Sequence, residues 1–225
     1  MFISYLELPA SDLLAQRDFY ANILELPVTF SPAGLEVKAG KTDLIFTQAT
    51  PDFGGAYHLA FNIPGSQFQA AKKWLSGRVP LLQDEDGKVE FKSESWNSDS
   101  VYFKDVAGNV LEFIAHHNLN DVVEGDFDGR QILQVSEIGL PAENVVALAD
   151  ELCTRLSLSV FKQQPNETFT PVGDDNGLFI VSIKDRIWIP DSGVPAKLLP
   201  IKVKGTAEGR EWEVRGVPYE IQRYR

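Results

Sequence analysis

An internal repeat is the feature of this 225-residue sequence that most constrains its fold. Residues 135–142 (VSEIGLPA) align with residues 3–10 (ISYLELPA), sharing a serine and a Leu-Pro-Ala ending that precedes helical spacing. Residues 216–220 repeat the Gly-to-Glu offset of residues 108–112 near the end of each half. The length alone allows one large domain or two compact ones. Two correspondences in the same order indicate a duplicated domain.

Alternating apolar and polar residues, bounded by Gly, Pro, Asn or Asp, predict short strands through the first half. Two segments with helical spacing interrupt them. One begins at the N-cap candidates Ser11 and Asp12, and the other runs from near Ser66 to Gly77. The order strand, helix and three strands is therefore predicted twice. Alternation identifies seven of these eight strands, at residues 2–8, 35–39, 43–47, 58–63, 88–92, 100–104 and 110–115.

The chain between the two halves is acidic and has neither helical nor alternating periodicity. It predicts a linker at residues 119–130 between an N-terminal domain, 1–118, and a C-terminal domain, 131–225. The second half begins with a strand and a helix that carries Val145, Leu148 and Leu152 on one face. Residues 198–212 then leave no room for another helix, so we predict that the second domain is truncated.

Charge and cysteine content exclude several classes of function. The chain has 21 basic and 32 acidic residues, a formal charge of -11, which disfavours nucleic acid and anionic membranes as partners. Cys153 is the single cysteine, so an intrachain disulfide or a CxxC metal site is excluded. The first twelve residues include Glu7 and Asp12 and no basic residue, so no secretory signal is expected. We expect a cytoplasmic protein.

Three segments resemble the vicinal oxygen chelate (VOC) superfamily, which includes glyoxalase I, extradiol dioxygenases and bleomycin resistance proteins. Residues 3–26 resemble its opening strand and helix, residues 57–61 (YHLAF) the first strand of a second module, and residues 101–113 (VYFKDVAGNVLEF) the closing hairpin. The resemblance covers residues 1–117 and reaches the second half through the repeat. It implies an α+β fold in which paired βαβββ modules face each other in a deep U-shaped sheet.

The resemblance also implies a divalent metal site in the first domain, with His58 and Glu112 at ligand positions. Imidazole and carboxylate donors suit Zn, Fe, Mn or Ni. Strand alternation places His58 and Ala60 on one face, opposite Leu59 and Phe61. A lone Glu112 between aliphatic neighbours is costly to bury, and a metal or a hydrogen bond from Tyr5 would each offset that cost.

The remaining ligand positions depart from the superfamily pattern. Tyr5 stands where a His or Gln is usual, and residues 44–47 contain no carboxylate. Tyr5 or Glu7 would then complete the metal shell or act as catalytic acid or base. Alternatively, Tyr5 fills the vacant space and Glu7 is an exposed charge. A dioxygenase needs two His and one carboxylate at the metal and a further acid/base His, and this chain has three His in all.

Two aromatic residues are candidates for substrate binding, and the second half offers fewer candidates. Trp96 and Tyr102 lie where the superfamily fold borders its cup, so they either stack on a flat substrate or belong to the core. Glu137 and Glu220 match the positions of Tyr5 and Glu112, but Pro200 matches His58. We therefore expect a structural role for the second half and any chemistry within the first 117 residues.

Two classes of function follow. The first is a VOC-type enzyme of lyase, isomerase or dioxygenase type, in which a metal held by His58 and Glu112 acts as a Lewis acid on vicinal oxygens of a small molecule. The alternative is a non-catalytic protein that sequesters a small molecule, as bleomycin resistance proteins do. A degenerate pair of domains serving assembly alone is a third reading. A monomer and a homodimer are both compatible with the sequence.

Overall fold

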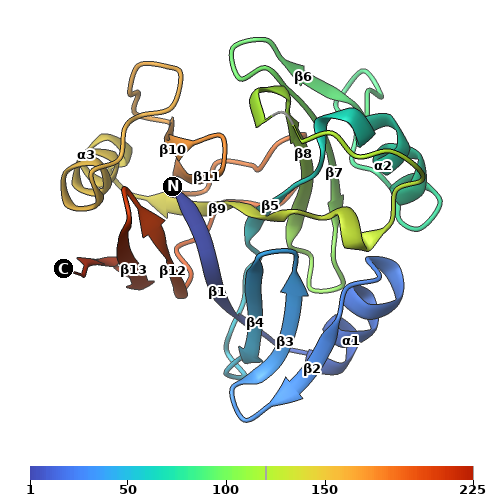
Figure 1. The fold of residues 1–225 in the computed structure, drawn as a ribbon. Helices are drawn as coiled ribbons and strands as arrows, with labels where there is room; N and C mark the ends of the chain where they lie inside the picture. Colours follow the sequence, from blue (N-terminus) through green and yellow to red (C-terminus); the bar gives the residue numbers. More distant parts are fainter. Residues whose placement is uncertain (120, 225) are drawn as a thin grey trace.

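The protein consists of two seven-stranded mixed sheets with helices on their outer sides (Figure 1). The structure is a computed structural model that describes residues 1–119 and 121–224; residue 120, within the predicted linker, lies outside the described residues. Sheet A has the order β14-β13-β12-β1-β4-β3-β2, and sheet B has the order β10-β11-β9-β5-β8-β7-β6.

The strands of sheet A are β1 (Phe2–Ala10), β2 (Val28–Ser31), β3 (Gly34–Ala39), β4 (Thr42–Gln48), β12 (Ile201–Ala207), β13 (Arg210–Gly216) and β14 (Glu220–Arg223). Those of sheet B are β5 (His58–Asn62), β6 (Phe91–Ser93), β7 (Ser98–Lys104), β8 (Val110–His116), β9 (Gln134–Ala142), β10 (Phe169–Asp174) and β11 (Gly177–Ile183).

Three α-helices accompany the sheets: α1 (Leu13–Asp18), α2 (Phe68–Ser76) and α3 (Val145–Leu156). The Asp12 carboxylate accepts the Ala15 amide at 2.9 Å, and the Asn144 side chain accepts the Ala147 amide at 3.0 Å. Both residues thus cap the first turn of a helix. A π-helical turn (Phe19–Ile23) extends α1, and 3-10 turns occupy Gly65–Gln67, His117–Leu119 and Gly129–Gln131. No helix of the described residues is long and apolar enough to cross a membrane.

Each sheet combines strands from both halves of the chain. In sheet A, β1 pairs antiparallel with β12, and in sheet B, β5 pairs antiparallel with β9. Within the modules, β1 runs parallel to β4, β5 to β8, and β9 to β11. The first and last modules therefore form sheet A, and the two middle modules form sheet B. The domain boundaries at 118 and 131 stay a prediction, but the cup of sheet B draws on residues from either side of them.

The predicted α+β class and the order of elements are confirmed. The structure adds β2, β10 and β11, which the sequence did not predict, begins β6 at Phe91 instead of residue 88, and places the last strand, β14, at Glu220–Arg223. The last module indeed lacks a helix, because only two residues separate β12 from β13.

The apolar residues of sheet B divide between its two faces as the alternation predicts. Leu59, Phe61 and Ile63 belong to the main core, which also contains Leu75 of α2. A smaller apolar cluster lines the other face of the sheet. It consists of Tyr102, Val110, Phe161, Leu178, Ile180, Trp188 and Ala196. This second face is the inside of a cup.

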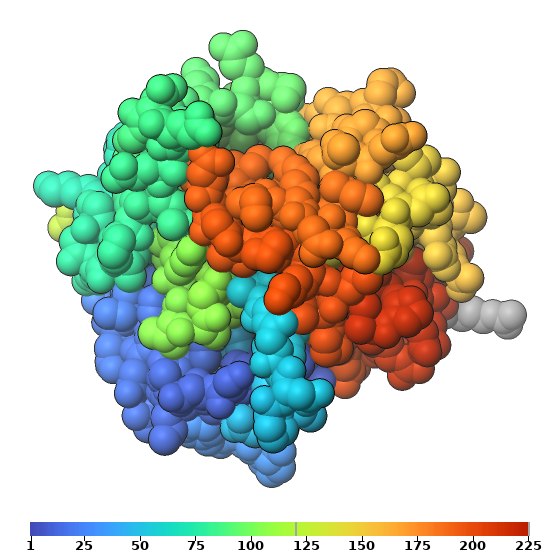
Figure 2. Space-filling view, turned by 180° about the vertical axis from the view of Figure 1, so that it is seen from behind, coloured from blue at the N-terminus to red at the C-terminus, as the bar shows by residue number. Residues whose placement is uncertain are grey.

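The segment between β11 and β12, residues 184–200, lies over this cup. Figure 2 shows it in orange across the middle of the face opposite to that of Figure 1. It folds back on itself as a hairpin, with the Trp188 amide donating to the Val194 carbonyl at 3.0 Å and the Ala196 amide to the Arg186 carbonyl at 2.8 Å. The Lys104 ammonium donates to the Ser192 carbonyl at 2.7 Å and fastens the hairpin to β7.

Candidate metal centre and pocket

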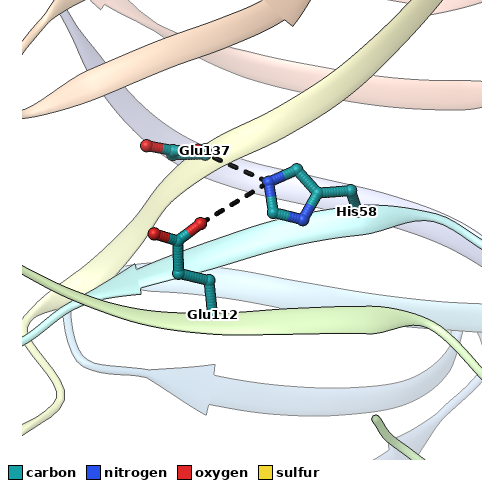
Figure 3. A group of neighbouring side chains, drawn as sticks. All are labelled: His58, Glu112 and Glu137. Atoms are coloured by element: carbon teal, nitrogen blue, oxygen red, sulfur yellow. Dashed lines mark ion pairs between the residues drawn. The ribbon is translucent and has the colours of Figure 1, made fainter. Parts of the chain in front are cut away.

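Three ionisable side chains from three adjacent strands converge inside the cup of sheet B (Figure 3). Ala60 on the central strand β5 lies opposite Glu112 of β8 on one side and Glu137 of β9 on the other. His58 precedes Ala60 by two residues and shares its face. The His58 Nε2 atom lies 3.7 Å from Glu112 Oε2 and 3.5 Å from Glu137 Oε2. All three side chains are buried.

The backbone determines how His58 presents its ring. Its Nδ1 atom lies 3.2 Å from the Val110 carbonyl oxygen, which can only accept a hydrogen bond. Nδ1 therefore carries the proton of the neutral imidazole, and the Nε2 lone pair points towards two carboxylates. A lone pair facing two anions is unfavourable unless a cation or an additional proton lies between them.

Burial perturbs both carboxyl groups. It raises the pKa of Glu112 to about 8, and the neighbouring Glu137 adds to that rise, while His58 and the hydroxyls of Ser100 and Tyr102 act against it. Burial likewise raises the pKa of Glu137 to about 8 and lowers the pKa of His58. The site thus holds extra protons at neutral pH in the absence of a metal ion.

The donor set fits a divalent metal ion. The second oxygen of Glu137, Oε1, is buried without a hydrogen-bond partner. One imidazole whose second nitrogen is held by a backbone carbonyl, together with two carboxylates, is a common ligand set for Zn, Mn, Fe or Ni. A cation held by Nε2 and the two carboxylates would remove this repulsion.

The three residues lie in a pocket of about 270 Å³ with largely aromatic walls. The Trp188 ring lies 5.1 Å from the His58 ring, and the Tyr102 ring lies 6.5 Å from it. The hairpin of residues 184–200 supplies Arg186, Trp188 and Ile189 to the wall. The other lining residues are Phe91, Lys92, Ser93, Trp96, Ser98, Ser100, Tyr102, Ile114, Gln163, Phe169 and Ile180.

The structure brings together four of the six residues predicted for the site. His58 and Glu112 are neighbours, and Trp96 and Tyr102 line the same pocket. Tyr5 and Glu7 do not join them, because β1 belongs to sheet A. Glu137, which we expected to be structural, takes the place beside His58 and Glu112 that was predicted for Tyr5 or Glu7. The cause is the pairing of β9 with β5.

The corresponding region of sheet A is an ion-pair network. The Tyr5 hydroxyl donates to Glu7, whose carboxylate lies 3.6 Å from the Lys202 ammonium. Lys204, opposite Tyr5 on β12, lies 3.4 Å from Glu213. Lysines therefore neutralise these carboxylates, and no second group of His, Cys, Asp or Glu suited to a metal occurs among residues 1–119 and 121–224.

Sequence reasoning missed Glu137 and Arg186 for different reasons. The internal repeat did align Glu137 with the ligand position of Tyr5. From the sequence alone, however, Glu137 groups with Glu220 of the same half and not with His58 and Glu112 of the first half. Glu220 instead lies on the edge strand β14 with its side chain 63% exposed. Arg186 lies in an irregular segment without periodicity or a motif, so no local signal identifies it.

Comparisons with known proteins support the fold. No family model and no curated protein sequence matches the chain. A solved structure described as a candidate dioxygenase from Bacillus subtilis matches 81% of this chain at 17% identity with a TM-score of 0.57, and the match spans 64% of that longer protein.

Two shorter structures match about half of this chain. A lactoylglutathione lyase from Agrobacterium tumefaciens is 22% identical, with 50% of this chain and 92% of that chain covered and a TM-score of 0.41. A glyoxalase/bleomycin resistance protein/dioxygenase from Nocardioides is 16% identical, with 56% and 89% covered and a TM-score of 0.42. The match with a TM-score of 0.57 shows a shared fold, and the two mixed sheets agree with the fold that the VOC resemblance implies.

Proposed function

We propose that the cup of sheet B binds a divalent metal ion through His58, Glu112 and Glu137 and acts on a small molecule held in the adjoining pocket. The observation that carries this proposal is the Nε2 lone pair of His58, which faces two buried carboxylates at 3.5 and 3.7 Å. The pocket beside them is large enough for a compact organic molecule.

A bound divalent ion would supply Lewis-acid polarisation of substrate oxygens. The protein's own residues orient the reaction. The Val110 carbonyl fixes the His58 ring. Burial raises the pKa of Tyr102 well above its usual value, so its phenol keeps a proton at neutral pH beside Glu112. Tyr102 is thus placed to donate a hydrogen bond to a substrate oxygen, and Trp188 shields the site from water.

The donor set favours lyase or isomerase chemistry over dioxygen activation. Non-haem iron oxygenases use two imidazoles and one carboxylate. The cluster of this chain has one imidazole and two carboxylates, and the buried His116 lies outside the pocket lining. We therefore rank hydrolytic, isomerising or eliminating reactions of an oxygen-rich small molecule first.

Metal analysis of the full chain purified without a chelating tag tests this proposal. We expect the wild type to take up a stoichiometric amount of a divalent ion, and His58→Ala, Glu112→Gln and Glu137→Gln to lose most of it. Glu213→Gln is the matched control, because Glu213 is a buried carboxylate of the other sheet. Absence of uptake by the wild type, or retention by all three variants, would contradict the proposal.

A binding protein without turnover is the second candidate. Its support is the aromatic wall formed by Phe91, Trp96, Tyr102, Phe169 and Trp188, which suits stacking on a flat ligand. Incubation of the metal-loaded protein with catechols and with hemithioacetals distinguishes the two candidates. Turnover that His58→Ala abolishes supports the enzyme, whereas tight ligand binding by metal-free protein supports the binding protein.

A further inference from the structure

Arg186 is a half-buried cation on the wall of the pocket. Its Nη1 atom is buried and has no hydrogen-bond partner, and its side chain makes no ion pair with any of the described residues. The guanidinium carbon lies 5.2 Å from the centre of the Phe169 ring. A half-buried guanidinium that lines a pocket and has no carboxylate partner among the described residues retains donors that an anionic ligand group would satisfy.

The charges of the pocket favour an anion. Its charged lining residues are Glu112, Glu137, Lys92 and Arg186. A divalent ion would balance the two carboxylates, leaving two cations on the wall of a protein whose overall formal charge is -11. A local positive potential in an acidic protein attracts a negatively charged ligand group.

The backbone around Arg186 holds it in place. The Asp185 amide donates to the Ala196 carbonyl at 2.8 Å, and the Ala196 amide donates to the Arg186 carbonyl at 2.8 Å. Ile187 and Pro195 form the next bridge of the same hairpin. A binding group held this way loses little conformational entropy when a ligand arrives.

We propose that Arg186 binds the carboxylate of a small aromatic or alicyclic acid, which makes the substrate of this pocket an organic carboxylic acid. This inference rests on the proposed function, since it names the substrate class of the same site. The planar guanidinium matches a carboxylate in shape and donor geometry. The aromatic walls contact the ring, and the metal ligands lie at the other side of the same pocket.

Binding of benzoate and of its neutral analogue benzamide tests the inference, measured by calorimetry on zinc-loaded and on metal-free full-length protein. We expect the wild type to prefer benzoate by about tenfold or more, as a charge-assisted hydrogen bond would give. Arg186→Gln loses this preference, because its affinity for benzoate falls about tenfold further than its affinity for benzamide. Arg186→Lys retains part of it, and Lys92→Gln, the control at another cation of the pocket, retains most.

The metal-free arm separates this inference from the proposed function. Preference for benzoate that depends on Arg186 but occurs in a protein unable to bind metal supports the inference and contradicts the metal site. Metal uptake by a protein that does not prefer benzoate supports the metal site and contradicts the inference. Equal affinity for both probes in the wild type, no binding of benzoate at millimolar concentration, or an unchanged preference in a folded Arg186→Gln variant overturns the inference.

Discussion

At the scale of single residues, the cup contains two buried carboxyl groups whose charged forms are disfavoured by burial. Glu112 and Glu137 lie within reach of the same imidazole nitrogen, and burial raises the pKa of each to about 8. Removing a buried carboxylate from water is costly without a cation. Protons and metal ions should therefore compete for the same atoms.

We predict that metal-free protein becomes less stable as the pH rises from about 6.5 to 8, above the range in which the lowered pKa values of the buried His58 and His116 give the opposite pH dependence. The unfolded carboxyl groups lose their protons near their ordinary pKa of 4.5, whereas the folded ones keep them until about 8. The folded state binds more protons across this window, so the free energy of unfolding falls with rising pH. Urea denaturation at several pH values measures this free energy of unfolding. Glu112→Gln should be more stable than the wild type at pH 8 by about 1 kcal/mol or more, and a flat profile for the wild type would refute the shift.

The effect of metal should have the opposite pH dependence. Zinc must displace the protons of Glu112 and Glu137, so its affinity rises with pH. We expect zinc to raise the melting temperature more at pH 8 than at pH 6, and to have little effect on His58→Ala at either pH. Thermal denaturation with and without zinc checks this. A larger effect at pH 6 would show that other groups bind the ion.

At the scale of elements, the hairpin between β11 and β12 covers the pocket because Trp188 of the hairpin packs directly against Gly139 of β9. A Cβ atom at Gly139 would lie 2.7 Å from the Trp188 ring and 3.4 Å from the Cβ of His58. The absence of a side chain at Gly139 thus allows the indole to pack against the imidazole. The contact between Gly139 and Trp188 therefore joins β9 to the hairpin.

Gly139→Ala should therefore displace Trp188 and open the site. We expect the free energy of unfolding to fall by about 1–3 kcal/mol, the usual effect of overpacking, and tryptophan fluorescence to shift to the red as the indole gains contact with water. Gly54→Ala is the control, because a Cβ there meets nothing within 4 Å. Denaturation and fluorescence of both variants measure the difference, and equal behaviour would argue against this packing.

At the scale of the whole molecule, the two halves depend on each other. The central strands β1 and β5 both belong to the first half, and each has a second-half strand, β12 or β9, on one side. Separation of the halves would expose one edge of both strands and divide the ligand set, leaving Glu137 apart from His58 and Glu112.

We predict that neither residues 1–118 nor residues 131–225 unfold cooperatively when expressed alone. Mixing the two fragments should restore cooperative unfolding and zinc binding, because the β1–β12 and β5–β9 pairings can form between separate chains. Circular dichroism during thermal denaturation measures the cooperativity of unfolding, and the same measurement with and without zinc shows whether the mixed fragments bind the ion. A fragment 1–118 that unfolds as cooperatively as the full chain would show instead that the first half is an independent domain.

Local patterns in the sequence predict much of the fold. Alternation predicted the strands and the face that His58 shares with Ala60, since side chains of a strand alternate whatever its partner is. Helical spacing predicted the helices, and Asp12, one of the two N-cap candidates, does cap the first of them. The resemblance to the VOC superfamily implied His58 and Glu112 as ligands, and the structure brings them together.

The identity of neighbouring strands depends on long-range contacts. Backbone hydrogen bonds between strands are the same for any partner, so alternation cannot distinguish β9 from another strand as the neighbour of β5. That pairing places Glu137 beside His58 and Glu112 at the proposed metal site and leaves Tyr5 and Glu7 in the other sheet. The position of Arg186 depends on a hairpin without periodicity, held by contacts to distant strands. Local sequence patterns thus predict the elements and two residues of the proposed metal site, and long-range strand pairing, which local patterns do not encode, adds the third.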